Sequence, residues 1–354
     1  MTPNPLLGAT ILSIGGCSSA LCYTPQKKTR AWSWQTYWLA QAAVCWFILP
    51  WIGAWLTTPQ LMTVLAETPT RVIVNTILLG ALFGVGGTAF GVAIRYLGFS
   101  ITYAIAIGIS CVVGTLFTPL LSGELAALLV RTGTAWVLAG VGVAAVGILV
   151  SGLAGWLKDT DLRKSDTMPE GFHLGKGLLF CVLAGVLSAV FGISLDVGRP
   201  IAAIAAAHGA GQFEGNVIYI FSCGGAFISS AAYCLFLHFR HGTLGEYVKL
   251  PTGSQKAWLP INFSMAALTG LLWYGQFFVY GAGQVRMGAY KFTSWAIINA
   301  MVVLFSAIVG LLMREWKGCR PRTWVALVSA FILLLVAVGL MTYGNYLGSM
   351  QKTL

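Results

Sequence analysis

Residues Leu271–Trp316 read LLWYGQFFVYGAGQVRMGAYKFTSWAIINAMVVLFSAIVGLLMREW. This stretch contains two apolar runs that are joined by the short polar link GQVRMGAYK, residues 283–291. Each run is long enough to cross the roughly 30 Å of bilayer hydrocarbon as a helix of about 20 residues. The stretch therefore predicts two consecutive membrane-spanning helices.

Both runs carry polar and aromatic residues at helical spacing. Trp273, Gln276 and Tyr280 share one face of the first run, and Trp295 and Asn299 share one face of the second. Aromatic rings beside amides suit a small polyol, because rings stack on its apolar faces and amides both donate and accept hydrogen bonds. These five residues are predicted to bind substrate. The alternative is that the rings lie at the membrane interface and the amides tie helices together.

The composition excludes several classes of protein. Of the 354 residues, 57% are hydrophobic and 9% are charged, against about 25% charged in soluble domains. The net charge of +11 is spread over short loops and forms no basic stripe, so a nucleic-acid partner is not expected. The eight cysteines form no CxxC pair, and there is no HExxH or GxxxxGK[ST] motif. We therefore expect a polytopic membrane protein that is not an enzyme and needs no cofactor.

Hydropathy predicts ten membrane spans, both termini on the same side, and a particular orientation. The loops after the odd-numbered spans hold 15 of the 21 Lys and Arg residues, and the remaining regions hold 6. Because basic loops stay in the cytoplasm, both termini are predicted to be periplasmic. The predicted spans are residues 5–24, 36–57, 73–95, 99–121, 134–157, 175–197, 215–238, 259–282, 290–313 and 323–346.

The two halves of the chain resemble each other. RYLGFS…GE begins at Arg95 and ends 29 residues later, and RMGAYK…RE begins at Arg286 and ends after the same interval. Five spans per half would make the second half enter the membrane from the opposite side, as in inverted-repeat transporters. We predict an all-α integral membrane fold with two inverted five-helix repeats, residues 1–157 and 175–354, joined by a cytoplasmic linker at 158–174.

Further polar residues are predicted to lie at mid-membrane depth. Ser19, Thr88 and Tyr103 are candidate substrate-binding residues because they add hydroxyl groups to the aromatic and amide set. The set suits a neutral sugar. An anionic substrate would want basic groups at the same depth, and the sequence supplies none there.

Two carboxylates stand out among the charged residues. Asp196 ends the sixth predicted span, where an ionisable group needs a reason, and it is the candidate proton-coupling residue. The alternative is a structural pair with Arg199, three residues further along the helix. Glu315 is flanked by Arg314 and Lys317, and we interpret it as part of a solvated ion pair.

The chain resembles the L-rhamnose–proton symporter family, within the drug/metabolite transporter superfamily, over nearly its whole length. The resemblance implies ten helices in two inverted repeats and uptake of L-rhamnose coupled to a proton. The segment around Asp196 matches less well than the rest. The matching motifs are CYTPQKK (22–28), WSWQTYW (32–38), FILPW (47–51), FGVGGTAFGVAIRYLGFSITYAIAIGISCVVGTLFTP (83–119), WYGQFFVYGAGQVRMG (273–288), SWAIINA (294–300) and REWKG (314–318).

The expected function is import of L-rhamnose or a similar deoxy-sugar with protons across a bacterial inner membrane, by alternating access. The expected partners are the sugar, protons and the lipid bilayer. An exporter of small metabolites or drugs with the same fold is the alternative, and its pocket would be more apolar and less selective for hydroxyl groups. A membrane enzyme would need a polar catalytic cluster that the sequence does not show, and a passive channel could not accumulate solute.

Overall fold

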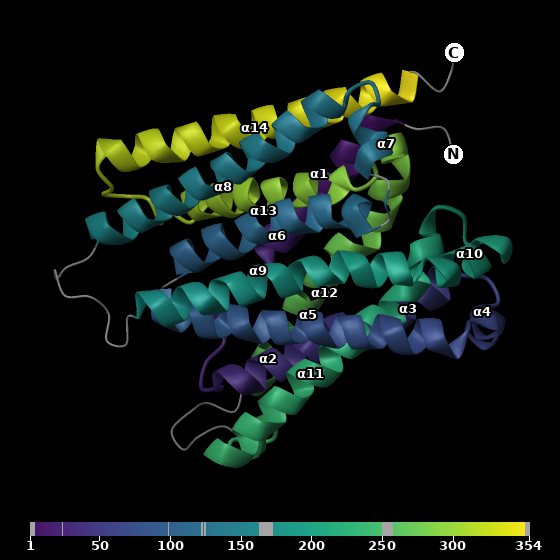
Figure 1. Cartoon of the computed structure of the whole chain (residues 1–354). Helices are drawn as coiled ribbons and strands as arrows, with labels where there is room; N and C mark the ends of the chain where they lie inside the picture. Colours follow the sequence, from purple (N-terminus) through teal and green to yellow (C-terminus); the bar gives the residue numbers. More distant parts are fainter. Residues whose placement is uncertain are drawn as a thin grey trace. The chain divides into compact units, whose positions relative to one another are not determined.

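A computed structural model of the chain describes residues 4–22, 24–97, 99–121, 123, 125–162, 173–249 and 258–350. Within these ranges the chain forms helices and turns and no strand, which confirms the all-α prediction (Figure 1). In chain order the helices are α1 (Pro5–Leu21), η1 (Pro25–Lys28), α2 (Trp34–Ala42), η2 (Ala43–Ile48), α3 (Leu49–Thr57), α4 (Leu61–Glu67), α5 (Thr70–Leu97), α6 (Phe99–Leu121), α7 (Leu125–Leu129), α8 (Thr134–Leu162), α9 (Leu174–Val197), α10 (Arg199–Ala207), η3 (Gly211–Val217), α11 (Ile218–His241), η4 (Leu244–Tyr247), α12 (Trp258–Gln284), η5 (Val285–Tyr290), α13 (Thr293–Leu312) and α14 (Pro321–Met350).

Every predicted span coincides with helical structure, and in the described residues seven segments are long and apolar enough to cross a membrane. The chain is thus a multi-pass membrane protein, while a crossing by all ten spans stays a prediction. α8 continues to Leu162 and takes in the first residues of the predicted linker. The seven segments are Trp34–Thr57, Thr70–Ala93, Thr134–Leu162, Leu174–Ala207, Gly211–His241, Thr293–Leu312 and Pro321–Met350.

The helices pack into two compact units that are not the two predicted repeats. Unit 1 consists of Met1–Ala20, Gly86–Ile193 and Ala282–Leu354, and unit 2 consists of Leu21–Val85 and Ser194–Gly281. Each unit therefore draws on both halves of the sequence. The repeat boundaries, which rest on sequence likeness, remain a prediction.

In unit 1, α14 runs along α8 at very short range (Figure 1). A β-carbon added at Gly133, which has a φ of +96°, would lie 2.2 Å from the carbonyl oxygen of Gly344. One added at Gly140 would lie 2.6 Å from the side chain of Met341. Small residues let two backbones meet in a membrane, where no hydrophobic drive exists between helices.

In unit 2, glycines of α5 likewise allow its backbone to approach that of α11. A β-carbon at Gly80 would lie 2.0 Å from the carbonyl oxygen of Ser222, and one at Gly84 would lie 2.6 Å from that of Ala226. These two glycines therefore allow the backbones of α5 and α11 to approach closely. Gly87, further along α5, has no such role, because an added β-carbon there would meet no atom within 4 Å.

Glu246 of η4 caps α2 within unit 2. The Glu246 carboxylate accepts hydrogen bonds from the backbone N–H of Ser33 at 2.7 Å, the Ser33 hydroxyl at 2.8 Å and the Thr36 hydroxyl at 2.5 Å. A negative charge is favourable at a helix N-terminus, where the backbone N–H groups lack partners. This cap fixes the start of the helix that carries Trp38.

Candidate functional site

The predicted substrate residue Trp273 lies in a cluster of aromatic rings in unit 2. Its ring centroid is 4.7 Å from that of Trp46, 5.5 Å from that of Phe277 and 6.3 Å from that of Phe83, which it stacks on at 17°. Such offset and edge contacts fix the orientation of each ring. Trp273 is half-buried, so the cluster holds it firmly and still leaves part of the ring uncovered.

Trp34 and Trp38, which were not predicted as site residues, extend this cluster. Trp38 stacks on Trp34 at 5.1 Å and meets Trp46 at 6.2 Å. The indole N–H groups of Trp38 and Trp46 are buried and have no acceptor in the part of the chain that the structure describes. Unpaired buried donors cost about 1–3 kcal/mol each, so they are candidates to meet a hydroxyl of a bound ligand. The spacing of Trp34 and Trp38, one helical turn apart, was the available signal.

Three further predicted residues lie in unit 2. Gln276 is 9% exposed and Tyr280 is 4% exposed, so both belong to the interior. The Asp196 carboxylate pairs with the Arg199 guanidinium at 2.7 Å, as the spacing indicated, and Tyr280 is close enough to interact with the charge of Asp196. Asp196 is 29% exposed and Arg199 is 66% exposed. The Asp196 carboxylate is thus partly accessible and is paired with a cation, which suits the proton-coupling and structural alternatives alike.

The other predicted amide and ring lie together in unit 1. The Trp295 indole N–H donates to the carbonyl of Ser110 at 3.0 Å and to its hydroxyl at 3.2 Å. Asn299 is 7% exposed, and its amide nitrogen donates to the Trp295 carbonyl at 2.7 Å. The tilted Phe191 ring lies 6.3 Å from the Trp295 ring. Trp295 therefore offers a ring face, and Asn299 offers its amide oxygen.

The remaining predicted residues also fall in unit 1. Ser19 is buried in α1, and Thr88 is half-buried in α5. Tyr103 belongs to α6, but its side chain lies outside the described residues. The predicted set therefore divides between the two units, and each unit contributes at least one tryptophan and one amide. Within the described residues, no group of three His, Cys, Asp or Glu side chains could hold a metal ion.

Comparison with known proteins decides the family. Residues 1–346 match the family described as "L-rhamnose-proton symport protein (RhaT)". The chain belongs to the L-rhamnose–proton symporter family. It is 36% identical over 333 residues to an L-rhamnose-proton symporter of Cronobacter sakazakii, covering 94% of this chain and 95% of that one. It is 33% identical over 342 residues to one of Yersinia pestis, covering 96% and 98%.

A solved structure shares the fold of this family member. A structure titled "Crystal structure of protein" superposes with a TM-score of 0.54 at 15% identity, covering 95% of each chain. At that identity the likeness extends to the fold alone. Membership in a family of symporters confirms that the chain is a transporter and not an enzyme.

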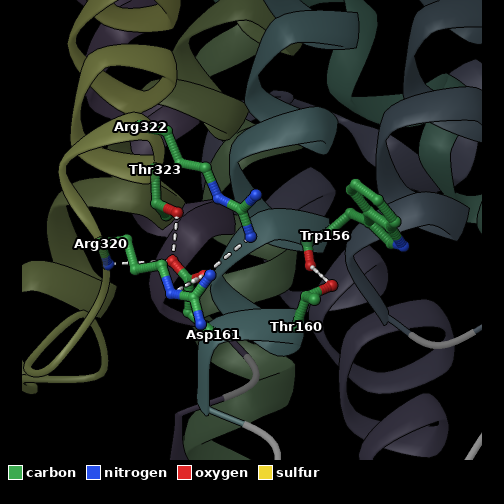
Figure 2. Close-up of polar contacts among 6 residues, drawn as sticks. All are labelled: Trp156, Thr160, Asp161, Arg320, Arg322 and Thr323. Carbon is green, nitrogen blue, oxygen red and sulfur yellow. Dashed lines mark hydrogen bonds and ion pairs between the residues drawn. The ribbon is translucent and has the colours of Figure 1, made fainter. Parts of the chain in front are cut away.

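One end of unit 1 of this symporter-family chain holds a dense set of polar contacts. Asp161 at the end of α8 accepts hydrogen bonds from the Arg320 backbone N–H at 2.9 Å, the Arg322 guanidinium at 3.1 Å and the Thr323 hydroxyl at 2.6 Å (Figure 2). Its side chain is 1% exposed. These bonds join α8 to the start of α14 and explain why α8 extends past the predicted span. Asp161 is thus a structural anchor that the sequence analysis did not identify.

Proposed function

We propose that this chain imports L-rhamnose together with protons. The observation that carries the proposal is the match to the symporter family over residues 1–346, with relatives that bear the same name over nearly their whole length. The lining chemistry agrees, because tryptophan rings and buried amides suit a neutral sugar. An exporter with the same fold has no comparable support.

The energetics permit accumulation. One proton moving inward gains about 2.3 kcal/mol per 100 mV of membrane potential. Each tenfold concentration ratio costs about 1.4 kcal/mol, so a single proton supports between one and two decades of accumulation. A pH gradient that is acidic outside adds to this drive.

The testing experiment is uptake of labelled L-rhamnose into proteoliposomes that contain the purified chain. We expect accumulation under an imposed inward proton gradient and collapse with a protonophore. If L-rhamnose equilibrates whether or not the gradient is present, the chain transports the sugar but does not couple it to protons. Movement of L-fucose in place of L-rhamnose would replace the substrate.

The finer topology belongs to the same proposal. We infer ten membrane-spanning helices in two inverted repeats, periplasmic termini and a bacterial inner-membrane location. Movement of one repeat against the other would open the sugar site to each side in turn. A reporter enzyme that is active only in the periplasm, fused after residue 354, tests the orientation. We expect an active reporter, whereas an inactive but intact fusion would show that the C-terminus is cytoplasmic.

We assign the substrate and proton roles as follows. The sugar-binding residues are proposed to be Trp273, Gln276, Trp295, Asn299, Tyr103, Thr88, Ser19 and Tyr280. Asp196 is the proposed proton-coupling residue, because it is a partly exposed carboxylate beside the interior Tyr280. Asp196→Asn should then abolish gradient-driven accumulation. Full accumulation by this variant would leave Asp196 as the structural partner of Arg199.

A further inference from the structure

A second carboxylate faces a cavity in unit 1. The cavity has a volume of about 130 Å³, which leaves room for water. It lies between α6, α8 and α13 and the turn that follows α13. Two of its lining residues carry charge, Lys158 and Glu315, while the others include Ser151, Ser306 and Trp316.

The backbone at the end of α13 places Glu315 there. The N–H of Arg314 donates to the Leu311 carbonyl and the N–H of Glu315 to the Gly310 carbonyl, both at 2.9 Å, which is the Schellman pattern. Arg314 occupies the left-handed position of this motif with a φ of +58°. Glycine is usual at this position because a side chain is disfavoured there. The next two side chains, Glu315 and Trp316, turn back over the helix.

The turned-back side chains share the space above Gly310. A β-carbon at Gly310 would lie 2.9 Å from the Trp316 indole nitrogen and 3.4 Å from a Glu315 carboxylate oxygen. Trp316 is 6% exposed, and its N–H has no acceptor among the described residues. An unpaired buried donor beside a carboxylate marks a site where a further hydrogen bond can form.

The cation of this site has two partners. The Lys158 ammonium lies 3.5 Å from the Glu315 carboxylate and 5.0 Å from the centre of the Trp316 ring. Lys158 is 18% exposed and Glu315 is 34% exposed, so water reaches the carboxylate more than the ammonium. A lysine within about 6 Å of an indole face is stabilised by the ring. Lys158 therefore keeps one favourable contact when the other is lost.

We propose that Glu315 is the site from which the coupled proton leaves, at the predicted cytoplasmic end of unit 1, while Asp196 remains the proposed site of proton uptake. This inference rests on the proposed function as a proton symporter. A hydronium ion in the cavity gives its proton to the carboxylate, so one O–H bond forms, one water is left, and the ion pair with Lys158 is broken. Lys158 then rests on the Trp316 ring. Release reverses each step, and the predicted orientation puts it on the side where an importer must deliver the proton.

The charged surroundings distinguish Glu315 from its neighbours. Arg314 and Lys317 on the same turn are exposed to solvent and do not line the cavity. Beyond the cavity wall, Asp159, Asp161 and Lys158 each lie within electrostatic reach of Cys319. Since Asp161 already accepts hydrogen bonds from three residues, protonation there would break an anchor. Protonation of Glu315 breaks the ion pair with Lys158 and leaves the three hydrogen bonds of Asp161 in place.

The decisive experiment compares two assays in proteoliposomes. With Glu315→Gln we expect gradient-driven accumulation of L-rhamnose to fall to a ratio of about 1, because no proton is carried. Exchange of labelled for unlabelled L-rhamnose should continue at the unmodified rate, because exchange needs no net proton movement. Asp159→Asn, on the same helical turn as Lys158 but away from the cavity, should retain both activities.

A second variant covers the case in which Glu315→Gln fails to fold. Lys158→Gln removes the neighbouring cation, which makes the carboxylate easier to protonate. The pH of half-maximal driven uptake should rise by about one unit. Retained accumulation by Glu315→Gln, loss of its exchange in folded protein, or an unchanged pH profile for Lys158→Gln would each overturn the proposal. If the unmodified chain moves no L-rhamnose in either assay, the proposed function has failed instead.

Discussion

The indole N–H of Trp295 donates hydrogen bonds to both the carbonyl and the hydroxyl of Ser110, at 3.0 and 3.2 Å. This contact ties α13 to α6 within unit 1. Because the donor is occupied, Trp295 has its ring face to offer to a sugar. Its position depends on Gly114 of α6, where a β-carbon would lie 2.5 Å from the indole nitrogen.

Gly114→Ala should therefore displace Trp295. The added methyl overlaps the indole, so the ring must tilt and the bonds to Ser110 must stretch. Because small misplacements of binding groups have large effects, we expect L-rhamnose uptake to fall about tenfold or more. Initial rates over a range of sugar concentrations measure the effect.

Gly108→Ala is the matched control on the same helix. There a β-carbon would lie 3.8 Å from the Ile148 side chain, which is an ordinary van der Waals distance. Uptake by this variant should stay near that of the unmodified chain. Equal uptake by both alanine variants would contradict the assignment of Trp295 to the sugar site.

The sequence predicted what depends on local pattern. Apolar runs of about 20 residues marked the helices, because length and hydropathy decide whether a helix can cross a bilayer. The i,i+3 spacing of Asp196 and Arg199 likewise predicted an ion pair, which the structure confirms at 2.7 Å. Contacts between distant segments were out of reach. Glu315 forms an ion pair, as predicted, but nothing in the sequence around it indicates the partner Lys158.

The candidate site shows the same division. Trp273 and Gln276 were predicted because they lie on one helical face, where the Trp273 ring lies beside the Gln276 amide. Trp46 was missed because it lies in the π-helical turn Ala43–Ile48, before Pro50, where helical spacing no longer predicts direction. Pro50 cannot donate to the carbonyl four residues earlier, which favours the wider turn.

Arg314→Gly should stabilise the protein. Arg314 has a φ of +58° and occupies the position of a Schellman motif that glycine prefers. Relief of this strain is worth about 1 kcal/mol. The melting temperature of the purified protein in detergent should rise by a few degrees.

Lys317→Gly is the control for that change. Lys317 lies in the same exposed turn but is not among the described residues with positive φ other than glycine. Glycine there adds freedom to the unfolded chain and relieves no strain, so the melting temperature should stay level or fall. A rise equal to that of Arg314→Gly would contradict the strain argument.

Asp161→Asn should weaken the junction between α8 and α14 without changing sugar binding. The substitution removes the charge that Arg320, Arg322 and Thr323 meet at distances of 2.6–3.1 Å (Figure 2). We expect the melting temperature to fall by several degrees while the half-saturating L-rhamnose concentration stays constant. Thermal unfolding and uptake kinetics on the same preparation separate the two effects.

Thr160→Ala provides the comparison on the neighbouring residue. The Thr160 hydroxyl donates to the Trp156 carbonyl within α8, so this bond joins α8 to no other element (Figure 2). Its loss should shift the melting temperature little. If Thr160→Ala were as destabilising as Asp161→Asn, the end of α8 would be sensitive to any substitution, and Asp161 would not be its anchor.

Trp46→Phe tests whether the unpaired indole donors of unit 2 serve the sugar. Phenylalanine keeps a ring beside Trp273, 4.7 Å away in the present structure, and removes the N–H that has no acceptor in the described ranges. A hydrogen bond to a sugar hydroxyl is worth about 0.5–1.5 kcal/mol, so the half-saturating L-rhamnose concentration should rise up to about tenfold. Trp55→Phe, at a side chain that is 71% exposed in the same unit, should leave that concentration unchanged. If the two variants behave alike in uptake and Trp46→Phe alone melts at lower temperature, Trp46 is a packing residue and the sugar finds its donors elsewhere.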